Sequence, residues 1–145
     1  MIPTFRRDGK LPAGTHTASW QEVEERFGQT PYRERLLAGL LRAMRLLRLA
    51  GCGTVYLDGS FVTAKAEPGD FDACWDIKAI QAELVAPIFF DFADGRAAQK
   101  EQFGGEFFPA QLPEGGTGKN WLDFFQQDRE GQPKGIVVID LESIP

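Results

Sequence analysis

The sequence predicts an α/β protein of the α+β type, in which a mixed β-sheet of about four strands packs against helices. Runs of β-forming residues bounded by glycine or proline occur at 54–58, 70–76, 103–110 and 135–141. A leucine-rich segment, 31–50, repeats its apolar residues at three- and four-residue steps, as an amphipathic helix does. The strands and the long helix together indicate one sheet with a helical layer.

Two helices are expected before the first of these strands. Residues 20–27 follow Thr17 and Ser19, either of which can cap a helix. The second helix should cover 30–50, because a threonine can cap it and a proline occupies its first helical position. Its apolar stripe, which must pack on a sheet or another helix, consists of Leu36, Leu37, Leu40, Leu41, Met44 and Leu47.

The remaining segments are assigned from turn signals and periodicity. Residues 1–18 contain two prolines and two glycines and are predicted to form an extended arm with turns. Helical spacing is found in 77–88 and in 93–102, and a short helix is expected at 121–127. Residues 113–119 are expected to form a glycine-rich loop, more typical of a lid or linker than of a nucleotide loop.

Length and composition narrow the classes of function. With 145 residues, the chain is expected to fold as a single domain, 1–145. No apolar run approaches the ~20 residues that span a bilayer, and no signal peptide is recognised, so we expect a cytoplasmic protein without membrane contact. Cys52 and Cys74 lack CxxC spacing, which indicates reduced, buried thiols. A single histidine, His16, argues against zinc sites and catalytic triads, so the chemistry must use carboxylates.

The net charge of −5 disfavours a broad surface for long polyanions. The main local exception is the 33–48 segment, which carries five arginines. A solvated helix face is the more common explanation of such a run, and a surface for phosphate or a partner is the alternative.

The candidate site begins with a pair of carboxylates. Because side chains alternate along a strand, Asp70 and Asp72 should project from one face and Phe71 from the other. Two adjacent carboxylates repel unless a cation or a proton neutralises them, and Mg²⁺ prefers such oxygen ligands. The alternative is that Asp70 belongs to a turn and Asp72 to a solvated strand position.

A phosphate-binding bend is expected close to this pair. Gly59-Ser60 follows the strand 54–58, and a glycine allows backbone amides to approach a phosphate while serine adds a hydroxyl. Lys65, between the bend and the aspartates, could reach triphosphate oxygens or could remain solvated. The two halves together predict a site for Mg²⁺ and a nucleoside triphosphate.

These residues resemble the signature of the polymerase-beta-like nucleotidyltransferase superfamily: a hydrophobic strand, Gly59-Ser60, nine intervening residues and Asp70-Phe71-Asp72. The chain also looks like small bacterial nucleotidyltransferase-like proteins associated with toxin–antitoxin loci. The resemblance implies a nucleotidyltransferase fold and a third carboxylate on a later strand. That carboxylate matches Glu106 best, with Asp91 as the competitor, and Glu106 departs from the usual aspartate.

The resemblance implies an Mg²⁺-dependent nucleotidyltransferase that moves a nucleotidyl group from a nucleoside triphosphate to a hydroxyl of a protein or RNA. Asp70, Asp72 and Glu106 would bind the metal, and Gly59, Ser60 and Lys65 would bind the triphosphate. The acidic chain favours a protein acceptor, with a tRNA end as the alternative. A second hypothesis is an inactive module of the same fold, an antitoxin that binds a cognate toxin through its basic helix and N-terminal arm.

Overall fold

The computed structural model describes residues 1–145 and contains one five-stranded mixed sheet. The strands are β1 (Gly14–Ala18), β2 (Thr54–Asp58), β3 (Phe71–Trp75), β4 (Gly105–Pro109) and β5 (Gly135–Asp140), in the order β1-β5-β2-β3-β4. Strand β2 is antiparallel to β3 and β5, whereas β1 is parallel to β5 and β4 is parallel to β3. The predicted α+β class with a mixed sheet is confirmed, with one strand more than expected.

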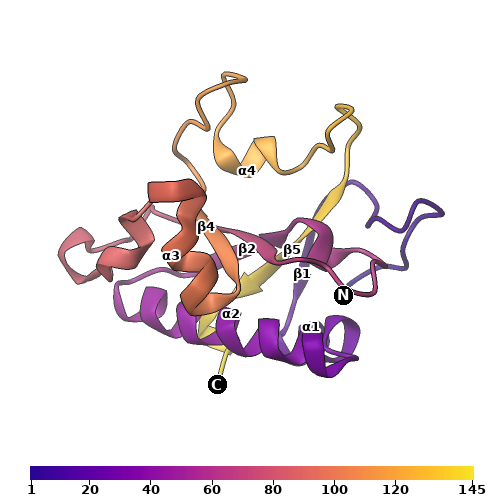
Figure 1. Cartoon of the computed structure of the whole chain (residues 1–145), viewed down its shortest axis with the longest axis horizontal. Coiled ribbons are helices and arrows are strands. Elements are labelled where there is room, and N and C mark those ends of the chain that lie inside the picture. Colours follow the sequence, from indigo (N-terminus) through magenta and orange to yellow (C-terminus); the bar gives the residue numbers. More distant parts are fainter.

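The helices are α1 (Trp20–Phe27), α2 (Pro31–Leu49), α3 (Ala93–Phe103) and α4 (Trp121–Phe124). Helices α1 and α2 lie on one side of the sheet, and α4 lies with its flanking loops on the opposite side (Figure 1). Helix α3 packs against β4 and α2. None of these helices is long and apolar enough to cross a membrane.

Both N-terminal helices begin where their capping residues predict. Ser19 accepts a hydrogen bond from the Glu22 amide and forms a capping box, and Thr30 accepts one from the Arg33 amide. The predicted leucine stripe of α2 faces the sheet, and Leu37, Leu40 and four more apolar residues of the helix are buried. This stripe forms the main core together with the inward-facing side chains of the strands, among them Val55, Leu57, Phe71, Ala73 and Phe107.

The second face of the sheet carries a much smaller apolar cluster. Cys74, Phe108 and Ala110 are buried there beneath side chains that include Trp121 and Phe125 of the α4 segment. Both cysteines are free and buried, as predicted. Burial raises the pKa of the Cys52 thiol to about 11, so this thiol is not a nucleophile at neutral pH.

Two predictions about secondary structure need correction. The arm 1–18 contains strand β1, which pairs with β5 at the edge of the sheet. Residues 77–88 do not form an α-helix but contain the 3-10 turns Ala82–Leu84 and Pro87–Phe90. The Gln81 amide donates to the carbonyl of Ala50, outside the segment, and a proline at the start of the second turn has no amide to donate.

Candidate active site

Three carboxylates gather on the second face of the sheet. Asp72 of β3 pairs in register with Glu106 of β4, and Asp70 lies one residue before β3. One oxygen from each carboxylate lies within 4.8 Å of the others. The neighbouring Phe71 and Ala73 are buried in the main core, so the predicted alternation along this strand is confirmed. The structure therefore brings together the three acids named from the sequence.

The glycine-serine bend lies against the same carboxylates. A Cβ placed on Gly59 would lie 2.6 Å from Asp72 Oδ2, so only a glycine leaves room for that carboxylate. The φ angle of Gly59 is +79°, a conformation that also favours glycine. Ser60 then begins a single 3-10 turn, Ser60–Val62. The two halves of the sequence motif are thus in direct contact.

The carboxylates lie in an environment that opposes their ionisation. Burial, with the neighbouring Asp70 and Glu106 charges, raises the pKa of Asp72 to about 7. Burial, followed by the charge of Glu106, raises the pKa of Asp70. The Lys100 ammonium lies 3.2 Å from the Glu106 carboxylate and partly offsets this excess of negative charge. A bound cation would offset it further.

A fourth carboxylate, which sequence reasoning missed, lies behind the cluster. Asp58 ends β2 directly opposite Asp72, is completely buried, and neither of its oxygens has a hydrogen-bond partner. Burial, together with the charge of Asp72, raises the pKa of Asp58 well above its ordinary value. Its position at the end of a β-rich run was visible in the sequence, but the cross-strand register that pairs it with Asp72 was not.

Asp70 and Asp72 line one wall of a cleft of about 1150 Å³. Ser60 contributes to this wall, and Lys65, for which the sequence left a phosphate contact and a solvated position open, lines the same cleft. Further lining residues come from the N-terminal arm, from the glycine-rich loop before α4 and from the chain between α4 and β5; they include Lys10, Thr117, Lys119, Phe124, Phe125, Arg129 and Lys134. The cations among them come from segments far apart in the sequence.

A buried arginine holds the loop that follows the bend. Arg33 of α2 is 6% exposed, and its guanidinium donates to the carbonyls of Phe61 at 2.8 Å, Thr63 at 3.2 Å and Lys65 at 2.6 Å. These bonds connect the long helix directly to the Ser60–Lys65 segment. Arg33 was assigned from the sequence to a run of surface charge, so its burial is a correction that only the tertiary structure reveals.

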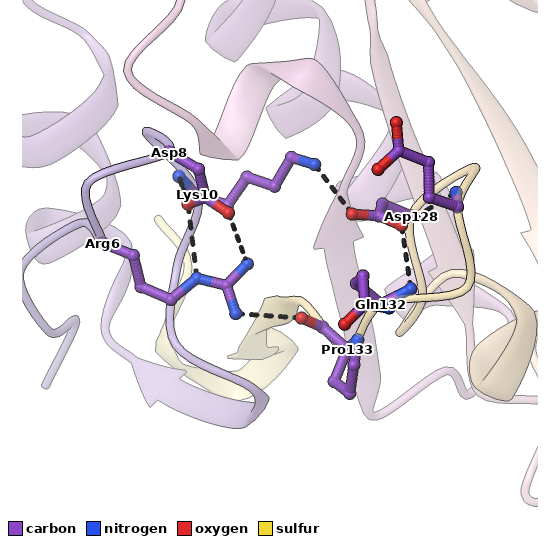
Figure 2. A network of polar contacts seen from close by, with 7 residues as sticks. Arg6, Asp8, Lys10, Asp128, Gln132 and Pro133 are labelled. Atoms are coloured by element: carbon purple, nitrogen blue, oxygen red, sulfur yellow. Dashed lines mark hydrogen bonds and ion pairs between the residues drawn. The ribbon is translucent and has the colours of Figure 1, made fainter.

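The N-terminal arm lines part of the cleft through Asp8, Gly9 and Lys10. Figure 2 shows Lys10 reaching across to Asp128 in the loop before β5, with its Nζ 2.9 Å from Oδ2. Arg6 donates to the carbonyl of Pro133 at 3.0 Å and to the carboxylate of Asp8. The Gly9 carbonyl accepts a hydrogen bond from the Ala64 amide. The arm therefore contacts both the loop after the glycine-serine bend and the loop before β5.

The competitor for the third acid lies outside this group. Asp91 is exposed, and its carboxylate accepts a hydrogen bond from the Ala93 amide at the start of α3. It is not among the acids that could share an ion, which are Asp70, Asp72 and Glu106. The geometry therefore favours Glu106 as the third ligand.

The residues present suit a hard divalent cation. All three donors are carboxylates, which is the ligand type that Mg²⁺ prefers. Asp58, buried beside Asp72 without a hydrogen-bond partner, is an unsatisfied polar group of the kind found next to ion sites. The arrangement thus places the ligand type that suits a metal ion beside a cleft whose cations suit a polyphosphate.

Comparison with known proteins identifies a family but no function. No curated protein and no solved structure matches the chain. One family model matches residues 3–140, a range that includes the whole sheet, the arm from Arg6 to Lys10 and all four carboxylates. The chain belongs to the family of unknown function DUF6932.

Proposed function

We propose that this protein is an Mg²⁺-dependent nucleotidyltransferase with a fold of the polymerase-beta-like kind. It would transfer a nucleotidyl group from a nucleoside triphosphate to a hydroxyl of a protein or an RNA. The observation that carries the proposal is the contact between the two halves of the motif. Asp72 lies against Gly59, one carboxylate oxygen each of Asp70, Asp72 and Glu106 lies within 4.8 Å of the others, and Asp70 and Asp72 line a large cleft.

Each group on this wall has a defined role in the proposal. Asp70, Asp72 and Glu106 would hold the metal, while Ser60 and the cations of the cleft would bind the phosphates. Bound Mg²⁺ would supply charge neutralisation at the phosphate oxygens and at the attacking hydroxyl. Arg33 would hold the loop after the bend, and Gly59 would leave the room that the Asp72 carboxylate needs beside the bend.

The reaction is an in-line displacement at the α-phosphorus. The acceptor oxygen forms a bond to this phosphorus, and the bond from the phosphorus to the oxygen bridging to the β-phosphate breaks. Pyrophosphate leaves with the electron pair of the broken bond. The acceptor's proton passes to a carboxylate of the site, and Lys65 and Lys134 are available to neutralise the leaving group because neither side chain has an ion-pair partner.

The contacts of the basic helix favour an enzyme over a binding module. Three of the arginines expected to form a partner surface donate to carbonyls of their own chain: Arg42 to Gln102, Arg45 to Pro145, and Arg48 to Leu141 and Ile144. A surface already used in this way offers less to a partner. These contacts give the arginines a role within the chain, and the acidic cluster supports the enzyme as the first proposal.

The decisive experiment is labelling by radioactive nucleoside triphosphates. Purified protein is incubated with each nucleotide, Mg²⁺ and candidate protein or RNA acceptors, and incorporation is compared for wild type, Asp70→Asn and Asp72→Asn. We expect either substitution to reduce labelling by about 100-fold or more. Asp91→Asn is the matched control and should label normally. Labelling that survives Asp72→Asn would refute the site, and absence of both labelling and nucleotide binding in the wild type would refute the proposal.

A further inference from the structure

Two aromatic rings line the cleft that contains Asp70 and Asp72, among lining residues that are otherwise mostly polar. Phe124 and Phe125 line the same cleft as Ser60 and Asp72, and apart from Ala64 every other lining residue is polar, charged or glycine. They come from α4 and the residue after it, on the side of the sheet that carries the acids. Two phenyl rings in such a cleft call for an explanation.

Core packing explains only one of the two rings. Phe125 packs against the small cluster on the second face, with its ring centroid 4.9 Å from that of Phe108 and a nearly parallel stack on Trp121 at 23°. Phe124 belongs to neither core cluster. Its ring meets those of Phe125 and Trp121 only at steep angles, 84° and 79°. Phe124 is half-buried, and its ring makes no parallel stack with another ring.

The charges around Phe124 indicate the chemistry of its partner. Lys65, Arg129 and Lys134 line the cleft, and none of their side chains makes an ion pair or a hydrogen bond within the chain. Acidic residues also line the cleft, and a ligand that uses both the unpaired cations and the Phe124 ring combines a flat aromatic group with negative charges. A nucleoside triphosphate has this combination, and stacking of a base on an aromatic side chain is a common mode of recognition.

We infer that Phe124 is the base-stacking residue of this protein, so that the base of the nucleoside triphosphate lies on the Phe124 ring while its phosphates reach Ser60 and Lys65. This assignment rests on the proposed function and adds a residue that the sequence motif does not include. Helix α4 is held in place by the Phe108 and Trp121 contacts, whose centroids are 4.3 Å apart. The ring is therefore presented by a packed segment.

Phe124 should contact the base and not the phosphates, so a ligand with a base is compared with a ligand that has none. Binding of ATP and of inorganic tripolyphosphate, each with Mg²⁺, is measured by calorimetry for wild type and Phe124→Ala. We expect Phe124→Ala to weaken ATP binding by about 10-fold or more and to leave tripolyphosphate binding unchanged. Phe124→Trp should retain ATP binding, because an indole also stacks, whereas Phe124→Leu should not.

The remaining outcomes distinguish a failure of the stacking role from a failure of the proposed function. Equal ATP affinity in wild type and Phe124→Ala, equal loss for both ligands, or full rescue by leucine would each overturn the stacking role while leaving the proposed function intact. Failure of the wild type to bind either ligand would overturn both. Phe90→Ala is the matched control, because Phe90 is 51% exposed and does not line the cleft. Thermal unfolding of each variant verifies that it is folded.

Discussion

Asp58 and Asp72 face each other across the antiparallel pair β2–β3, and the inner of these two carboxyls, Asp58, is buried without a single hydrogen-bond partner. Such an arrangement costs free energy, because ionising either carboxyl places a charge in surroundings of low dielectric, and ionising both adds repulsion between like charges. It is the kind of local cost expected where a site is built for a cation.

The first prediction concerns stability against pH. The folded-state pKa of Asp72, about 7, is higher than that of an unfolded aspartate, so the folded protein binds the proton more tightly. The contribution of Asp72 to stability should therefore be full below about pH 4 and should be lost as the pH rises through about 7. Without divalent ions, Asp72→Asn should melt roughly 5 °C above wild type at about pH 8, with a smaller difference at about pH 5.

Divalent ions should reverse the order of the two melting temperatures, so that wild type melts above Asp72→Asn. Mg²⁺ should raise the melting temperature of wild type at about pH 8 and have little effect on Asp72→Asn. Asp91→Asn should follow wild type in every condition, since Asp91 is exposed and lies outside the acidic cluster. A metal-free Asp72→Asn protein that is less stable than wild type at about pH 8 would contradict the prediction.

A second prediction tests the contact between the bend and the carboxylate. Gly59→Ala would place a Cβ 2.6 Å from Asp72 Oδ2 and hold alanine at a φ of +79°. We expect a loss of about 1–2 kcal/mol in the free energy of unfolding. Nucleotide transfer should fall by on the order of 100-fold because Asp72 is displaced.

The matched control for this substitution is Gly53→Ala. A Cβ at Gly53 meets nothing within 4 Å, and Gly53 does not have a positive φ. Chemical denaturation and the labelling assay should both report near-wild-type values for it. If Gly59→Ala were equally harmless, the close approach of Asp72 would have no functional meaning.

The third prediction concerns Arg33, which connects α2 to the loop after the bend. Arg33→Met removes four donated hydrogen bonds, to Phe27 as well as to the three loop carbonyls. Because buried carbonyls then lose their partners, we expect about 3 kcal/mol of destabilisation in urea unfolding. Arg35→Met, on the exposed side of the same helix, should cost less than about 0.5 kcal/mol.

Activity of the Arg33→Met protein gives a further check. At a temperature where the variant is folded, its KM for the nucleotide should rise, because the Ser60–Lys65 segment is no longer held. An unchanged KM combined with the expected destabilisation would show that Arg33 only supports the fold.

The fourth prediction decides the third acid. Glu106→Gln should reduce labelling by on the order of 100-fold, and Asp91→Asn should leave it unchanged. Loss of the Glu106 charge also frees Lys100, whose pKa is raised by the hydrogen bond and charge of that carboxylate. The Lys100 pKa should therefore fall in Glu106→Gln, which NMR titration can measure. The opposite pattern of labelling would assign the role to Asp91.

Much of this architecture follows from local patterns. The helix 20–27, the long helix that Thr30 caps and the strand 54–58 depend on capping residues and periodic apolar side chains, which act within a few positions along the chain. The projection of Asp70 and Asp72 from one face of the sheet also follows from the alternation of side chains along a strand. Local rules failed at 77–88, where the apolar spacing suits a helix but the Gln81 amide bonds to a distant carbonyl.

The sequence by itself determined the fold class, the acidic pair and the glycine-serine bend, because each depends on residues that are neighbours in the chain. Only the tertiary structure decided that β1 joins the sheet, that Arg33 is buried and that Asp58 lies opposite Asp72. It also placed Phe124 in the same cleft as Ser60. Each of these relationships joins segments that are tens of residues apart in the chain. Strand register and the packing of layers bring such segments together, and no local pattern encodes either of them.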